Sequence, residues 1–249
     1  MAGEAVAKAE PDGYTLLLGN DTMLVVNPHL YKMSFDPLTG LIPVASVVSN
    51  QFYISIGPSL GPKTLREFID FARASRPSLA YGSAGVGSMH HLSMELLKQH
   101  AGIDLQHVPY RGGSAAVTGV LSGEVQAISS GGSSAPLITA GQLRGIATTG
   151  RNRSSLFPDL PAVAELFPGY EATIWLGLFA PVGTPEWIIE RLRSETNKVL
   201  AMPDVSSRMQ TSSGMDPFVS APEAFASLIR SDYEKYGTLI RTIGLSPRP

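Results

Sequence analysis

The chain has 249 residues, which is enough for one large domain or two small ones with a sizeable hydrophobic core. Its 19 Lys and Arg residues nearly balance its 21 Asp and Glu residues, so no bulk positive field favours nucleic acid or anionic lipid as a partner. It contains no Cys, which excludes disulfides, thiol nucleophiles, iron–sulfur clusters and Cys-ligated zinc.

The first part of the chain predicts a helix followed by three buried strands. Helix formers fill residues 2–10, and a Pro-Asp-Gly turn stops them. Apolar runs of strand length cover residues 14–18, 44–48 and 52–56. The first of these runs ends in a short polar loop, residues 19–22.

Residues 64–148 alternate between strands and helices. A capping box from Thr64 to Glu67 predicts the start of a helix with one apolar face. The strands expected next are 79–82, 106–108, 125–129 and 143–148, and the helices between them are 91–100, 114–121 and 136–140. A strand, a glycine-rich loop and a helix, repeated three times, predict a mostly parallel open sheet. Such sheets bind ligands at the carboxyl ends of their strands.

The last part of the chain predicts one more strand and two helices. Residues 175–180 form another apolar run of strand length. Thr184 followed by Pro185 is a favourable helix start, so we expect a helix that runs to about Met202. A capping box from Ser220 to Glu223 predicts a final helix towards residue 243.

The most informative segment is the loop 82–90, between an expected strand and an expected helix. It contains three glycines and two serines, which would bring free backbone N–H groups and hydroxyls to the positive end of a helix. That chemistry suits a carboxylate or a phosphate, so we interpret the loop as an anion-binding site. The alternative is a tight turn without a ligand, although one turn rarely needs so many glycines.

A dinucleotide site is a second interpretation of the same loop. Gly85 and Gly87 supply the first two glycines of a G-x-G-x-x-G motif, but His90 stands at the third glycine position. Asp104 follows at about the spacing of a ribose-binding acid, yet it precedes the next expected strand instead of ending it. A nucleotide-binding α/β enzyme is therefore the alternative hypothesis for function.

Two further loops between a strand and a helix carry polar groups. In the loop 108–114, Arg111 could pair with a carboxylate and Tyr110 could close over a small ligand. A solvated loop charge is an equal alternative for Arg111. The loop 129–134 has no charged residue, so any ligand contact there would come from hydroxyls or backbone.

Motifs of catalysis and metal binding are absent from the sequence. No serine lies in a G-x-S-x-G motif, no glycine is followed by Lys-Ser or Lys-Thr, and no H-x-x-x-H pair offers a zinc site. We interpret the five His residues as ordinary polar residues, with His90 as a candidate ligand contact in the first turn of its helix. Neither an enzyme activity nor a metal or cofactor is expected.

Several segments carry a family likeness that covers essentially the whole chain. The most specific are YGSAGVGS with the following His, then HVPYRGG and GLFAPVGTP. In this order they resemble the Bug-type extracytoplasmic solute receptors of tripartite tricarboxylate transporters. The resemblance implies a periplasmic protein that binds a small carboxylate, chiefly through backbone amides, hydroxyls and ordered water. It also implies that the ligand passes to the membrane subunits of a transporter.

The resemblance further implies a fold similar to type II periplasmic binding proteins. Two α/β domains with mostly parallel sheets would be joined by two hinge strands, 52–56 and 175–180. Residues 1–56 plus 173–249 would form domain 1, residues 57–172 would form domain 2, and the ligand would lie in the cleft between them. The ligand-binding residues carried over by position are Asn20, Asp21, Thr22, Ser83, Ala84, Gly85, Gly87, Ser88, His90, Tyr110, Arg111, Gly112 and Ser130.

The chain departs from the family pattern in three places. The loop 129–134 lacks the Asp-Asn pair of many members, so an amino-bearing ligand would lose a counter-charge. Asp21 stands where members usually have a small hydroxyl residue, and its charge would repel a carboxylate. The chain also starts without the family's first strand, glycine-rich loop and most of a helix. We therefore expect an incomplete domain 1, with an open sheet edge that could recruit a second copy.

The start of the chain leaves two expectations for its location. No apolar run approaches the length of a membrane span, so direct membrane insertion is not expected. Residues 1–10 lack the pattern of a signal peptide. The location would be periplasmic by resemblance, and cytoplasmic if Met1 is the genuine start. A third hypothesis for function is a truncated copy with little ligand binding of its own.

Overall fold

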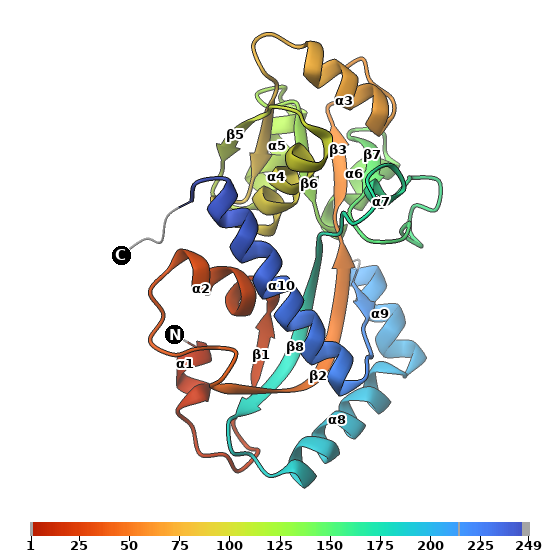
Figure 1. The fold of residues 1–249 in the computed structure, drawn as a ribbon. Helices are drawn as coiled ribbons and strands as arrows, with labels where there is room; N and C mark the ends of the chain where they lie inside the picture. The colour runs from red at the N-terminus through yellow and green to blue at the C-terminus, as the bar shows by residue number, and fades with distance from the viewer. Residues whose placement is uncertain (1, 214, 246–249) are drawn as a thin grey trace. The chain divides into compact units, whose positions relative to one another are not determined.

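The chain folds into two compact units, each with its own β-sheet (Figure 1). The computed structural model describes residues 2–213 and 215–245. Unit 1 comprises Met1–Ser49 and Ile174–Pro249, and unit 2 comprises Asn50–Thr173. The contacts therefore place the strand 53–56 in unit 2, whereas the sequence assigned it to domain 1. The hinge role of the strands 52–56 and 175–180 stays a prediction.

Unit 1 contains a four-stranded sheet in the order β1-β8-β2-β9. The strands are β1 (Leu17–Asn20), β2 (Leu41–Gln51), β8 (Thr173–Pro181) and β9 (Asp216–Pro217). β1 pairs antiparallel with β8, and β9 pairs antiparallel with β2. The helices are α1 (Ala2–Ala7), the π-helix η1 (Thr22–Val26), α2 (Asn27–Leu30), α8 (Glu186–Leu200), α9 (Pro203–Ser213) and α10 (Pro222–Thr242).

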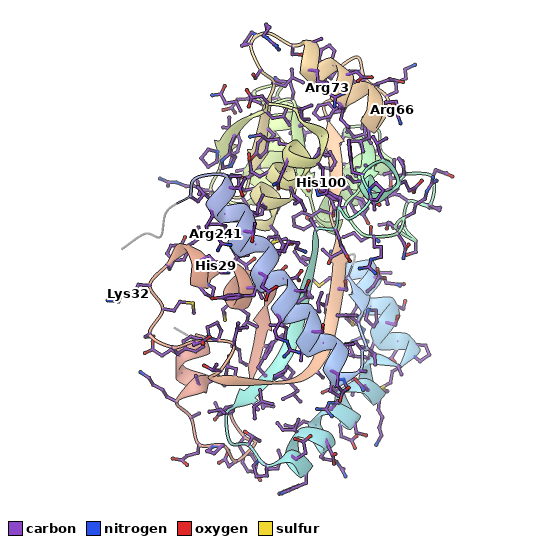
Figure 2. The ribbon with its side chains drawn as sticks, viewed as in Figure 1. His29, Lys32, Arg66, Arg73, His100 and Arg241 are labelled. Carbon is purple, nitrogen blue, oxygen red and sulfur yellow. The ribbon has the colours of Figure 1, made fainter. Side chains whose placement is uncertain are left out.

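The long helix α10 organises the core of unit 1 by packing against η1 and α2. Trp175 of β8 is buried, and its indole N–H donates to Asp232 Oδ2 on α10 at 2.9 Å. The Trp175 ring meets Phe225 of α10 edge to face, with ring centroids 5.3 Å apart. On α2, His29 lies beside α10 (Figure 2), and its Nε2 donates to the backbone oxygen of Tyr233 at 2.9 Å.

Unit 2 contains a five-stranded sheet in the order β5-β4-β6-β3-β7. The strands are β3 (Tyr53–Ile56), β4 (Ala80–Ser83), β5 (Gln106–Pro109), β6 (Ala127–Ser130) and β7 (Arg144–Thr148). The helices are α3 (Leu65–Ala74), α4 (Met89–Ala101), α5 (Gly113–Leu121), the 3-10 helix η2 (Gly132–Ser134), α6 (Ala135–Thr139) and α7 (Val163–Leu166).

The α/β fold is confirmed, but the sheets are mixed instead of mostly parallel. β4 pairs parallel with both β5 and β6, as the repeated strand–helix pattern predicts. β3 runs antiparallel to its neighbours β6 and β7. In unit 1, β1 and β8 are far apart in the sequence, and no strand–helix–strand crossover forces them to be parallel. The parallel pattern read from the sequence therefore applies only to the repeats of unit 2.

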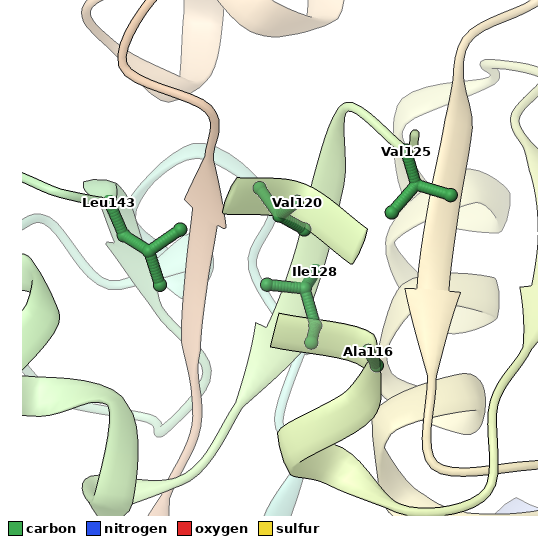
Figure 3. Close-up of a cluster of buried hydrophobic side chains, with 5 residues drawn as sticks. All are labelled: Ala116, Val120, Val125, Ile128 and Leu143. Atoms are coloured by element: carbon green, nitrogen blue, oxygen red, sulfur yellow. The ribbon is translucent and has the colours of Figure 1, made fainter. Parts of the chain in front are cut away.

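A hydrophobic cluster fixes α5 on the sheet of unit 2 (Figure 3). Ala116 and Val120 of α5 pack with Ile128 of β6, Val125 and Leu143, and all five side chains are at most 2% exposed. Burying a Val, Leu or Ile side chain contributes about 1.5–3 kcal/mol to stability. The cluster therefore holds the start of α5 in a defined place, and with it the loop that joins β5 to α5.

Several element boundaries differ from the sequence prediction. β1 begins at Leu17, so Tyr14 precedes it with 92% of its surface exposed, and Asn20 belongs to the strand. Thr64 caps α3 as predicted, because its hydroxyl accepts the Glu67 N–H at 3.2 Å. Thr184 does not cap α8; its hydroxyl donates to the Pro181 oxygen at 2.8 Å. Among the described residues, no helix is long and apolar enough to cross a membrane.

Candidate functional site

Three loops of unit 2 come together at one edge of its sheet. They follow β4, β5 and β6, which are neighbouring strands that point in the same direction. Because the carboxyl ends of parallel neighbours meet at one edge, the loops 83–90, 110–112 and 130–134 lie side by side there. The structure thus brings together all the predicted site residues of unit 2.

The loop between β4 and α4 is held in shape by glycines and serines. Gly85 and Gly87 have φ angles of +120° and +81°, which residues with a side chain rarely adopt. Ser83 Oγ accepts the Gly85 N–H at 3.1 Å. Ser88 Oγ donates to the Gly85 oxygen at 2.7 Å and caps α4 by accepting the His91 N–H at 3.3 Å. Both serine hydroxyls are therefore used inside the protein.

Of the backbone N–H groups and hydroxyls expected to face an anion, the two serine hydroxyls are engaged within the protein, which leaves the backbone N–H groups as the candidates. The 13-residue helix α4 begins at Met89, and the first N–H groups of a helix have no partner within it. These groups carry the positive end of the helix dipole. Ser83 is fully buried and supports the loop through its hydroxyl, and its role as a direct ligand contact stays a prediction.

His90 lies where the first two loops meet. Its ring packs at 4.8 Å from the ring of Phe52, and a Cβ atom on Gly113 would come within 2.9 Å of its Cε1. Burial lowers the pKa of His90, and a hydrogen bond with the Ser129 backbone offsets this only in part. This burial favours the neutral form of the ring, and the contact of His90 with a ligand stays a prediction.

The loop between β5 and α5 contains a partly buried residue, Tyr110, next to an exposed one, Arg111. Tyr110 packs against the cluster of Figure 3, and a side chain at Gly119 would collide with its ring. The expectation that Tyr110 closes over a ligand stays a prediction. Arg111 is exposed and has no hydrogen bond or ion pair with any described residue. Gly112 has a φ of +107° and leads the chain into α5.

In the third loop, residues 130–134, the Ser130 and Ser134 hydroxyls bond to groups of the same loop. Ser130 is buried, and its hydroxyl donates to Ser134 Oγ at 2.8 Å. Ser134 Oγ in turn donates to the Gly131 oxygen at 2.8 Å. The Ser130 side chain is therefore engaged within its own loop.

Sequence reasoning missed two His residues beneath the first loop. His91 and His107 stack with their ring centroids 3.9 Å apart. The Gly87 N–H donates to His91 Nδ1 at 3.1 Å, and Ser83 Oγ lies 2.6 Å from His107 Nε2. The signal that could have found them is the parallel pairing of β4 with β5, because it sets Tyr81 opposite His107.

The remaining predicted residues, Asn20, Asp21 and Thr22, lie in unit 1. Asn20 Oδ1 accepts the Met23 N–H at 2.9 Å, and Asp21 Oδ1 accepts the Thr22 N–H at 2.6 Å. Asp21 is only 2% exposed, and burial raises its pKa to about 7. It is therefore not the fully charged loop carboxylate that the sequence suggested. The part of these three residues in ligand binding stays a prediction.

The family is decided by the match of nearly the whole chain. Residues 1–245 match the model of the tripartite tricarboxylate transporter family receptor. The chain belongs to this family. The protein BugT of Bordetella pertussis (strain Tohama I) is 30% identical, over 97% of this chain and 75% of its own length. The Bug-type resemblance of the sequence is thereby confirmed.

Solved structures of the same fold include two with a bound dicarboxylate. Rpa4515 of R. palustris with adipate superposes with a TM-score of 0.84 at 29% identity, over 99% of this chain and 83% of its own. MatC of Rhodopseudomonas palustris with bound malate has a TM-score of 0.76 at 27% identity, over 96% and 83% of the two chains. Among the described residues of our chain, no group of three or more acidic or His side chains is placed to hold a metal.

Proposed function

We propose that this receptor binds a small dicarboxylate at the loop edge of unit 2 and delivers it to the membrane subunits of a tripartite transporter. The observation that carries the proposal is the loop between β4 and α4, which presents the first N–H groups of α4 at that edge. The loops 82–90, 108–114 and 129–134 contain no Asp or Glu, so no carboxylate there repels the ligand. The adipate and malate held by the two solved relatives support this ligand class.

The chemistry of the site favours reversible capture. One ligand carboxylate would accept hydrogen bonds from the N–H groups at the start of α4, where the helix dipole adds about 0.3–1 kcal/mol. The Arg111 guanidinium, which is exposed and unpaired among the described residues, would bind the second carboxylate through charge-assisted hydrogen bonds. One carboxylate is then held by backbone groups without a counter-charge and the other by a single exposed guanidinium, which favours reversible binding.

The partners and the location follow from the family. A receptor of a tripartite transporter hands its ligand to membrane subunits, and we propose that this handover takes place in the periplasm. The dimer expected through an open sheet edge stays a prediction. We expect it to involve β1, which is an edge strand of the unit 1 sheet.

The experiment is a calorimetric titration of the purified chain with adipate, malate, citrate and butyrate. We expect at least one dicarboxylate to bind, and butyrate to bind much more weakly because it has one carboxylate. A ligand at 100 times its Kd should stabilise the fold by about 2.7 kcal/mol. Parallel titrations with ATP and NAD test the alternative enzyme hypothesis. If no carboxylate binds, or if only a nucleotide binds, the proposal is wrong, and binding by this chain contradicts the truncated-copy hypothesis.

A further inference from the structure

Three aromatic rings form a stack beneath the loop between β4 and α4. His91 lies on α4, and its ring stacks on His107 of β5 at 3.9 Å. The Tyr81 ring of β4 lies nearly parallel to both imidazole rings, with its centroid 5.0 Å from that of His107 and 6.4 Å from that of His91. We call Tyr81, His91 and His107 the ring stack. Tyr81 is fully buried and His91 nearly so.

The ring stack is hydrogen-bonded to the loop at two points. The Gly87 N–H donates to His91 Nδ1 at 3.1 Å, so this nitrogen carries no proton. The Ser83 hydroxyl lies 2.6 Å from His107 Nε2 and also accepts the Gly85 N–H at 3.1 Å. Two of the loop glycines are thus connected to the two His rings, one directly and one through Ser83.

Burial keeps both His residues neutral, while the nearby charges act in opposite directions, because Lys98 lowers the pKa of both rings and Glu95 raises that of His107. From α4, Glu95 accepts the Tyr81 hydroxyl at 2.5 Å and the Lys98 ammonium at 2.8 Å. Lys98 Nζ lies 5.9 Å from the centroid of the Tyr81 ring. Burial is the main cause that lowers the pKa of both rings, and the pKa of His91 falls to about 3, with His107 and Lys98 as further causes. A neutral His91 can accept the Gly87 N–H, whereas a protonated one cannot.

We propose that His91 and His107 are positioning residues of the ligand site, which hold the loop between β4 and α4 in its anion-binding conformation without touching the ligand. The proposal rests on the proposed function, because it assigns the loop to a carboxylate. A loop that lost the Gly87 hydrogen bond would leave a buried N–H group without an acceptor. It would then populate other conformations, and the affinity would fall in proportion to the competent fraction.

Two substitutions of His91 separate positioning from packing. In His91→Asn the side-chain oxygen takes the place of Nδ1 and still accepts the Gly87 N–H, whereas His91→Leu fills the space of the ring without an acceptor. We expect His91→Asn to bind adipate or malate within about threefold of wild type, and His91→Leu to bind roughly tenfold more weakly. The melting temperature should be lower for His91→Asn than for His91→Leu, because Asn leaves a cavity that Leu fills.

The same design applies to His107 of β5, and a control is available on α4, the helix that carries His91. His107→Gln keeps a polar group near Ser83 Oγ and should bind better than His107→Leu. His100, at the far end of α4 (Figure 2), contacts the rings of Phe167 and Tyr170. His100→Leu should leave the affinity unchanged. If affinity follows stability across the pairs, or if the Asn and Leu variants of His91 bind alike, the positioning role is overturned.

A ligand-free measurement keeps this test independent of the proposed function. In ¹H–¹⁵N spectra, the Gly87 amide proton should shift upfield in His91→Leu and stay near its wild-type position in His91→Asn. An unchanged Gly87 amide in His91→Leu would overturn the proposal even if the wild-type chain binds adipate. A shifted Gly87 amide in a chain that binds no carboxylate would instead support positioning of the loop and reject the proposed function.

Discussion

At the scale of single residues, burial changes the protonation of the Asp21 carboxyl group. Asp21 is 2% exposed, and its pKa is raised to about 7. Burial is the main cause, and nearby Asp232 adds to it, while the hydrogen bonds from Thr22 oppose it. The ordinary pKa of an Asp side chain is about 3.9. The folded chain therefore keeps a proton that the unfolded chain loses between these two values.

The substitution Asp21→Asn should stabilise the protein above neutral pH. Below about pH 4 both states are protonated and the variant should match wild type. As the pH rises from 4 to 7, the wild-type free energy of unfolding should decrease, and above pH 7 the variant should be more stable by roughly 3–4 kcal/mol at most. Urea unfolding at pH 4, 6 and 8 measures this, with Asp70→Asn on the exposed face of α3 as control. Equal stability of wild type and variant at pH 8 would contradict it.

The His29 ring packs so closely on Gly237 of α10 that a side chain at this position would collide with it. A Cβ atom at position 237 would lie 2.5 Å from His29 Cε1. The His29 ring is fixed by its bond to the Tyr233 oxygen and by the Tyr233 ring at 4.2 Å. We expect Gly237→Ala to lower stability by about 1–3 kcal/mol, visible as a lower melting temperature. Gly61→Ala is the matched control, because nothing lies within 4 Å of its Cβ position, and an equal effect of both would refute the steric explanation.

At the scale of elements, the loop between β5 and α5 contains two adjacent residues that differ in burial. Tyr110 is partly buried against the core cluster beside α5, whereas Arg111 is exposed. Arg111→Ala should therefore weaken dicarboxylate binding about tenfold, since it removes a charge-assisted contact, and leave the melting temperature unchanged. Calorimetry and a thermal melt on the same sample measure both. Arg66→Ala on α3 (Figure 2) is the control, and unaltered affinity of Arg111→Ala would remove Arg111 from the site.

Features set by residues close in sequence are easier to predict than features set by strand register or packing. The cap at Thr64 and the glycine-rich loops of unit 2 depend on residues within one turn and agree with the prediction, although the equally local cap expected at Thr184 does not form. The ring stack depends on the register between β4 and β5, and the inward position of Tyr110 depends on the space left by Gly82 and Gly119. Neither pattern is visible along the chain. The ligand-binding roles of the predicted residues stay predictions.

At the scale of the whole molecule, the low charge content fits a receptor that uses backbone groups for recognition. Charged residues make up 16% of the chain, against about 25% in an average soluble protein. Several of them form exposed ion pairs, such as Arg153 with Glu165 at 2.7 Å, which contribute little to stability. Relatives with different dicarboxylates share the fold at 27–29% identity with this chain. We therefore expect the loops of unit 2, more than the scaffold, to set which acid is bound.

The two tryptophans have a consequence for fluorescence measurements. Trp175, buried against Asp232, and Trp187, which is 69% exposed, both belong to unit 1. The chain contains no other Trp, so unit 2 emits only through its tyrosines. Tryptophan emission during denaturation consequently reports the unfolding of unit 1, including the effect of Asp21. Circular dichroism is needed to follow the unit that carries the proposed ligand loops.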